Sequence, residues 1–370
     1  MPKQVDDKTW EVTLRDGAKF TDGNPVTTDD VVFSFERVLD PANKSLYASF
    51  IPFVEKVEKK DDKVVTIKTK YPFSLVPERL SVVKVVPKAA VEADPKAFDM
   101  MPIGTGAYKM TDNGASSQKV VLERNDDYNG PRPAKVKTVE VDIIPDDSTR
   151  TNALTSGAVM AIDSVPATNL ASLSESKDVA AKQGFGLVFV LFNNGPNSPM
   201  KEQKNRQAIM YALDYAKICS VGMSDLATPA SCFVQEDHPA YKKASTVYSY
   251  DLEKAKALLA ETGLKEIKFL ATNHGFFSGV RPIVKENLEA LGIKVSYDEK
   301  KSADAYAAIG DNPDVMDVFL APGDPSVFGD DADLLLRWWY AGEAWVKDRM
   351  QWKGSDSYNK VQKLLDTASA

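Results

Sequence analysis

The stretch that decides the fold is WEVTLRDGAKFTDGNPVTTDDVVFSF, residues 10–35. Its first residues alternate large apolar and polar side chains and then reach an Asp-Gly turn, which predicts a strand over Trp10–Leu14 with one buried face. Thr27, followed three residues later by Asp30, is a variant of the capping box. We therefore expect a helix of about three turns that begins after Thr27 and ends at Asp40-Pro41.

The rest of the chain predicts an α/β protein. Residues 54–71 alternate as in a hairpin that turns at Asp61-Asp62, and the apolar run 187–192 is typical of a buried strand. The C-terminal third has strand–helix–strand order, which favours a parallel sheet. The patterns also predict strands at 119–124, 136–144, 266–271 and 293–298, and helices at 146–156, 201–218, 251–262 and 279–291.

Length and composition exclude several classes of protein. The 370 residues are too many for one ordinary core, so we expect two or three domains. A net charge of −7 and a pI near 5.2 argue against nucleic-acid binding, which needs a basic face. The sequence has no apolar run long enough to span a bilayer and no signal-peptide pattern, which taken alone favours a cytoplasmic protein.

The opening stretch closely resembles the signature of family 5, the peptide/nickel-type extracellular solute-binding proteins of ABC importers. The resemblance rests on Leu-Arg-Asp-Gly, then Phe-x-Asp-Gly-x-Pro, then a capped helix, and it extends over residues 10 to about 340. Further blocks resemble the family in the same order: Ile103-Gly-Thr-Gly-Ala-Tyr, Leu122-Glu-Arg-Asn-Asp-Asp-Tyr, Leu191-Phe-Asn-Asn, and Asn205-Arg-Gln-Ala-Ile.

The resemblance implies an α/β fold like that of the periplasmic binding proteins, of type II with the three lobes of cluster C. Residues 1–102 would then form the family's extra lobe, 103–235 the first ligand-binding lobe with the hinge strand, and 236–370 the second. Family members extend beyond both ends of this chain, so we expect it to be truncated at both termini. Such a chain is expected to expose apolar surface and to bind ligand weakly.

The resemblance also implies the function. The protein would capture di- or oligopeptides outside the cytoplasm, in the periplasm or as a cell-surface lipoprotein, and deliver them as a monomer to the permease subunits of the importer. Neither a cofactor nor an enzymatic activity is expected. The alternatives are uptake of nickel, haem or oligosaccharide, a non-transport sensor or adhesin, and an α/β hydrolase. Because His238 and His274 are the only histidines and no Gly-x-Ser-x-Gly elbow is present, the metal and hydrolase alternatives are disfavoured.

Asn193 and Asn194 follow the apolar strand, where their amides could donate to and accept from a peptide backbone. The alternative is that they only form an Asx turn. Asp324 lies in a loop that resembles the one before the family's pocket, where a carboxylate pairs with the ligand's amino terminus. That carboxylate aligns with Ala321, so either Asp324 substitutes for it or the ligand has no amine. The full set of candidate ligand-binding residues is Phe192, Asn193, Asn194, His274, Phe276, Asp324 and Phe328.

Two cysteines remain, Cys219 and Cys232. They are either unrelated thiols or a disulfide closing a short loop, and export of the family favours the disulfide. With no other Cys or His nearby, no metal site is expected.

Overall fold

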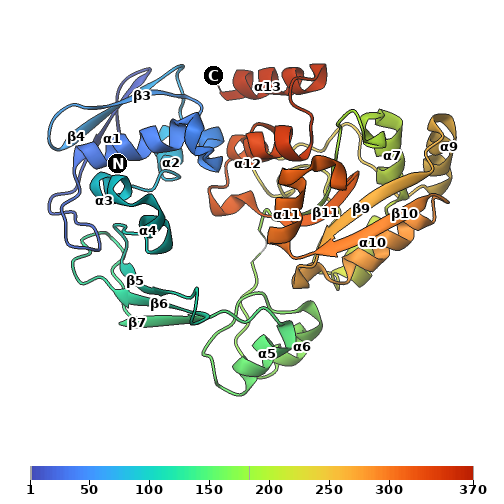
Figure 1. The fold of residues 1–370 in the computed structure, drawn as a ribbon, viewed down its shortest axis with the longest axis horizontal. Coiled ribbons are helices and arrows are strands. Elements are labelled where there is room, and N and C mark those ends of the chain that lie inside the picture. Colours follow the sequence, from blue (N-terminus) through green and yellow to red (C-terminus); the bar gives the residue numbers. More distant parts are fainter. Residues whose placement is uncertain (1, 183, 370) are drawn as a thin grey trace. The chain divides into compact units, whose positions relative to one another are not determined.

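The structure is a computed structural model that describes residues 2–182 and 184–369. The chain divides into two compact units, one of residues up to Pro145 together with the last residues from Thr367, the other of Asp146–Asp366 (Figure 1). The predicted lobe boundary at residue 102 falls within the first unit and that at 235 within the second. The division into three lobes stays a prediction.

The first unit contains a four-stranded antiparallel sheet with the strand order β1-β2-β4-β3. Helix α1 (Thr28–Leu39) packs on β3 and β4 and buries Val31, Phe35 and Val38. The strand predicted at Trp10–Leu14, the helix after Thr27 and the hairpin of residues 54–71 are all confirmed. The strands are β1 (Lys3–Asp6), β2 (Thr9–Thr13), β3 (Val54–Lys59) and β4 (Val64–Thr69).

The capping box at the start of α1 is present. The Thr27 hydroxyl accepts from the Asp30 N–H at 3.3 Å, and the Asp30 carboxylate accepts from the Thr27 N–H at 2.9 Å. The other Asp30 oxygen accepts from the N–H of Lys88 at 2.8 Å. One buried carboxylate therefore fixes the N-termini of two helices, α1 and α3 (Lys88–Ala93).

The first unit also holds a three-stranded antiparallel sheet, β5-β6-β7. No residue of these strands is fully buried, and Val136, Val141 and Ile143 at or beside β7 are exposed. The strands are β5 (Tyr108–Asn113), β6 (Lys119–Arg124) and β7 (Thr138–Asp142), and the remaining helices of this unit are α2 (Val76–Leu80) and α4 (Pro95–Met100).

The second unit is built on a four-stranded sheet with the order β10-β9-β11-β8. Strand β9 runs parallel to both β10 and β11, whereas β8 is antiparallel to β11, so the predicted parallel sheet is confirmed. The strands are β8 (Leu187–Phe192), β9 (Glu266–Thr272), β10 (Lys294–Lys300) and β11 (Val318–Gly323).

Helices cover both faces of this sheet. Alternate residues of β9 and β11 point to opposite sides, as the period of two of a strand requires. Phe269 and Val318 pack with α7, α9 and α10 on one side, whereas Leu270 and Phe319 pack with α11 and α12 on the other. The helices of this unit are α5 (Asp147–Thr155), α6 (Leu170–Ser174), α7 (Gln203–Ala212), α8 (Tyr215–Lys217), α9 (Leu252–Thr262), α10 (Val280–Glu289), α11 (Ser302–Asp311) and α12 (Ala332–Tyr340), with α13 (Asp356–Ser369) ending the chain.

Two predictions need correction. The helix expected at 201–218 ends at Ala212, because the backbone of Leu213 is extended and the next N–H, that of Asp214, donates to the Asn287 side chain on α10 at 2.9 Å. Cys219 and Cys232 are free thiols, so the predicted disulfide is absent. Cys219 lies in the π-helical turn Ile218–Gly222, which packs on α10, whereas Phe233 beside Cys232 packs on Tyr340. Burial, with a smaller contribution from Asp225, raises the pKa of the Cys219 thiol.

Candidate functional site

The strand order of the second unit creates a topological switch point. The chain runs from β9 through α10 to β10 on one side of β9, and then through α11 to β11 on the other side. Helices α10 and α11 pack on opposite faces of the sheet. In open α/β sheets, ligands bind outside the carboxyl ends of the strands at such a point. The carboxyl ends of β9 and β11 are therefore the candidate position of a ligand-binding site.

Strands β9 and β11 separate at this edge. Their pairing runs from Phe269↔Val318 to Ala271↔Leu320 and ends there, although both strands continue. Beyond that point β9 stays paired with β10, and β11 with β8. Thr272 is fully buried where β9 ends, and its hydroxyl has no hydrogen-bond partner among the described residues. A buried polar atom without a partner is unusual and marks this point as a candidate for ligand contact.

His274 and Phe276 lie just beyond the end of β9. Their rings meet edge to face with centroids 5.0 Å apart, and both side chains are exposed. The His274 carbonyl accepts from the Arg281 guanidinium at 2.9 Å, and the Asp147 carboxylate lies against Gly275. Partial burial lowers the pKa of His274; Asp147 raises it, while Arg150 and Arg281 lower it further.

Asp324 lies just beyond the end of β11. Its backbone is extended, with φ −134°, as expected for a residue before proline. One carboxylate oxygen accepts from the N–H and the hydroxyl of Ser326, at 2.9 and 2.6 Å. The other oxygen has no hydrogen bond from the described residues and lies beside Gly184, where a Cβ would be 3.3 Å from it. This oxygen could accept a hydrogen bond from a ligand.

Aromatic side chains border the Asp324 loop. The ring of Phe328 stacks at a tilt on Trp338, with centroids 5.2 Å apart, and the Trp339 indole lies so close to Gly323 that a Cβ there would be 2.6 Å from it. Gly184 is held by the Gln235 amide, which donates to its carbonyl at 3.2 Å. Neither Gly184 nor Gln235 lies in a local sequence pattern that would mark it as a site residue.

The structure places the other predicted residues at the opposite edge of the sheet. Phe192 ends β8 opposite Val318, at the amino end of β11, whereas Leu187 pairs with Gly323 at the carboxyl end. The two ends of β8 are about 17 Å apart at the usual rise per residue. Phe192, Asn193 and Asn194 are therefore not brought together with His274, Phe276, Asp324 and Phe328.

The amides at that opposite edge are engaged within the protein. The Asn193 side chain is fully buried; it donates to the Pro313 and Met316 carbonyls and accepts from the Gly195 N–H at 2.8 Å and from Gln351 at 2.7 Å. The bond to Gly195 is the Asx turn that was the alternative prediction. Asn194 donates to the Met350 carbonyl at 2.9 Å. We leave Phe192, Asn193 and Asn194 out of the site proposed below.

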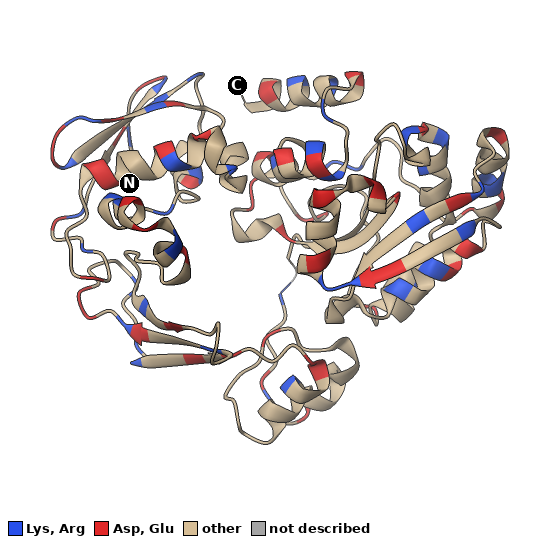
Figure 2. Cartoon of the chain, viewed as in Figure 1, with Lys and Arg blue, Asp and Glu red and all other residues tan. Residues whose placement is uncertain are grey.

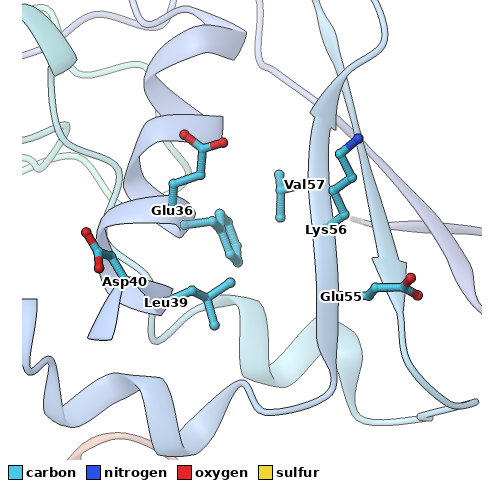
Figure 3. Close-up of a pocket in the computed structure, with 7 residues that line it drawn as sticks. Glu36, Leu39, Asp40, Glu55, Lys56 and Val57 are labelled. Carbon is cyan, nitrogen blue, oxygen red and sulfur yellow. The ribbon is translucent and has the colours of Figure 1, made fainter. Parts of the chain in front are cut away.

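The first unit has a small groove of about 310 Å³ between α1 and β3 (Figure 3). Leu39 and Val57 line it together with the charged residues Glu36, Asp40 and Glu55. Nothing in the groove resembles the convergent polar groups of a ligand site.

Charged side chains of both signs are spread over the chain. Lys and Arg are interspersed with Asp and Glu over the elements of both units (Figure 2). Within residues 2–182 and 184–369, no cluster of three or more His, Cys, Asp or Glu could hold a metal ion. Among the same residues, the structure contains no helix with the length and apolar character needed to cross a membrane.

Comparison with known proteins identifies the family. The family model of the bacterial extracellular solute-binding proteins, family 5 (middle), matches residues 3–360. The chain belongs to this family. Family 5 proteins are substrate-binding proteins, and their fold is the predicted periplasmic-binding-protein type of α/β architecture.

Two known proteins illustrate the similarity. The oligopeptide-binding protein AppA of Bacillus subtilis is 30% identical over 318 residues, which are 77% of this chain and 57% of AppA. The structure of AgaA of A. tumefaciens R10 in complex with agropinic acid superposes with a TM-score of 0.86 at 28% identity, covering 99% of this chain and 74% of AgaA. The chain spans about half the length of the curated relatives that it matches.

Proposed function

We propose that this protein binds peptides outside the cytoplasm and delivers them to the permease subunits of an ABC importer. The observation that carries the proposal is membership of family 5 over nearly the whole chain, together with the similarity to the oligopeptide-binding protein AppA. We further propose that the protein acts as a monomer, as a periplasmic or lipid-anchored component, and that it binds its solute without catalysis.

We propose that the ligand lies at the carboxyl ends of β9 and β11. Asp324 supplies the carboxylate oxygen beside Gly184. The exposed ring of His274 supplies a polar contact and that of Phe276 an apolar one. Phe328, stacked on Trp338, forms the wall beyond the Asp324 loop. A few fixed polar groups among aromatic side chains are what a small-molecule site requires.

A second candidate ligand is a solute without a free amino terminus. Ala321, which aligns with the family's amine-binding carboxylate, is fully buried among apolar side chains of the sheet. It therefore offers no charge to an ammonium group. AgaA, which resembles this chain, was crystallised with agropinic acid, so this compound belongs in the test.

Isothermal titration calorimetry with a panel of ligands tests the proposal. The panel contains tri- to pentapeptides, their N-acetylated forms, agropinic acid and the nickel–histidine complex, with AppA as the positive control for peptides. Saturable binding of free peptides is the expected result. Binding of only N-acetylated peptides or agropinic acid would favour the second candidate, and binding of none of the organic ligands would overturn the proposal.

A further inference from the structure

Arg349 ends the π-helical segment Ala344–Arg349 and lies against two aromatic rings. The centre of its guanidinium is 4.2 Å from the ring of Tyr306 and 4.2 Å from that of Trp345, and the two rings are 82° apart. The side chain is partly buried. This burial lowers the pKa of Arg349, whereas Tyr306 and Asp348 raise it.

In the part of the chain that the structure describes, no carboxylate forms an ion pair with this guanidinium. Among residues 2–182 and 184–369, the guanidinium of Arg349 has neither an ion pair nor a hydrogen bond, and it lies over the two rings. Other arginines of the second unit differ: Arg337 pairs with Asp333 at 2.9 Å, and Arg281 with Glu299 at 3.2 Å. A charge withdrawn from water is normally paired with an opposite charge. The surroundings of Arg349 therefore favour binding of an anion.

A second unpaired donor belongs to the same group of side chains. Trp345 is 4% exposed, and its indole N–H has no acceptor among the described residues. The guanidinium and the indole N–H can only donate hydrogen bonds. The guanidinium lies over the face of the ring that carries this N–H, so two groups that can only donate hydrogen bonds lie together with no acceptor among the described residues.

Arg349 lies between the two edges of the sheet. The next two residues, Met350 and Gln351, bond to the Asn193-Asn194 turn at the opposite edge, whereas the rings beside Arg349 lead towards the candidate site. The ring of Trp345 contacts that of Trp338 with centroids 6.0 Å apart, and Trp338 in turn stacks on Phe328 beyond Asp324. A chain of ring contacts therefore connects Arg349 with the carboxyl end of β11. Asp324 could accept from a cationic group of a solute, and Arg349 could donate to an anionic one.

We propose that Arg349 and Trp345 form a binding site for a carboxylate group. Resting on the function proposed above, this site would hold a carboxylate of the captured solute, either the carboxyl terminus of a peptide or an acid group of another solute. The edge of a guanidinium donates two parallel hydrogen bonds to a carboxylate, and charge-assisted bonds of this kind are the strong ones.

The first experiment uses acetate as the probe and requires no knowledge of the solute. Thermal unfolding is measured at constant ionic strength while acetate replaces chloride, for the wild type, Arg349→Met and Arg206→Met. Arg206 is the matched control, because its guanidinium in the same unit is already engaged by the carbonyls of Met200 and Lys201. Acetate should raise the melting temperature of the wild type and of Arg206→Met but not of Arg349→Met.

Without acetate, Arg349→Met should be about as stable as the wild type, because loss of the cation–π contacts is offset by removal of the cost of desolvating a partly buried charge. A variant that loses only the response to acetate has lost a binding group rather than a structural one. An equal response to acetate in the wild type and Arg349→Met, or no response in the wild type, would overturn the proposal.

The second experiment separates this site from the proposed function. Peptides and their carboxy-terminal amides are titrated into the wild type and Arg349→Met. The amides, and any peptide with Arg349→Met, should bind at least about tenfold more weakly than the free peptide binds the wild type. Equal binding of acids and amides would refute the role in solute binding and leave peptide capture intact. A response to acetate without peptide binding would keep the carboxylate site and refute peptide capture.

Discussion

At the scale of single residues, the sequence singled out Asp324, His274, Phe276 and Phe328 as candidates, and the structure places each of them after a strand or in its loop. Their role in binding stays a prediction. It could not identify Arg349 or Trp345, because neither lies in a motif and only the folded chain leaves their donors without acceptors. It also ranked Asn193 as a ligand group. An amide after a strand looks the same in sequence whether it faces a ligand or, as here, is buried by the turn that it closes.

Asp324→Asn tests the carboxylate at the end of β11. The amide keeps an oxygen that can accept from Ser326, so the loop should persist, but the negative charge beside Gly184 is lost. We expect peptide affinity to fall about tenfold or more, the equivalent of about 1.5–3 kcal/mol for a charge-assisted hydrogen bond. Calorimetry of the variant and the wild type measures the change.

The matched control is Asp251→Asn, which alters another exposed carboxylate that caps a helix in the same unit. It should bind as the wild type does. Unchanged affinity in Asp324→Asn for peptides with a free amine would show that Asp324 does not bind the amine.

His274 should make the stability of the protein depend on pH. Its pKa is lowered in the folded protein, chiefly by burial, so the folded state binds a proton less readily than an unfolded chain with a pKa of about 6.5. The contribution of neutral His274 to the free energy of unfolding is therefore fully present above about pH 6.5. It is lost as the pH falls through the lower pKa of the folded state. Acidification should then destabilise His274→Asn less than it destabilises the wild type.

Melting temperatures of both proteins between about pH 8 and about pH 5 test this expectation. His238→Asn controls for the loss of an imidazole elsewhere. Parallel curves for the wild type and His274→Asn would contradict the account of His274.

At the scale of elements, local patterns predicted most of the described strands but fewer than half of the described α-helices. The capping box and the alternation before it are local, and α1 and β2 formed where they indicated. Helix α7 ends early because of a tertiary contact, the side chain of Asn287, which the local pattern does not contain.

Strand β11 was missed because Ala321-Pro322-Gly323 resembles a loop. Pro322 is tolerated there because pairing with β9 has ended at Leu320 and only β8 remains as a neighbour. The strand that carries Asp324 therefore depends on the same separation of strands that creates the switch point.

Asp30→Ala tests the junction of α1 and α3. The substitution leaves the N–H groups of Thr27 and Lys88 without their acceptor, so we expect a loss of about 2 kcal/mol or more in the free energy of unfolding. Urea unfolding of the full chain, followed by circular dichroism, measures it. Asp29→Ala should cost less than about 1 kcal/mol, because its exposed carboxylate forms only a surface ion pair with Lys59. Equal losses in the two variants would refute the role of Asp30.

At the scale of the whole molecule, the order of motifs along the sequence predicted the family, and the match over residues 3–360 confirmed it. The position proposed for the site within the second unit did not follow from those motifs. It follows from the strand order β10-β9-β11-β8, which brings residues some 50 positions apart, such as His274 and Asp324, to the same edge of a sheet. Strand order depends on which helices cover which face, and no local pattern contains that information.

Hydrogen–deuterium exchange of the full chain, with and without a saturating ligand found in the calorimetric panel, tests the position of the site most directly. We expect the ligand to slow exchange in residues 273–278, after β9, and 324–329, after β11, and to leave residues 193–195 and the groove between α1 and β3 unchanged. Slower exchange at residues 193–195 and 313–317 instead, with no change after β9 and β11, would contradict the account.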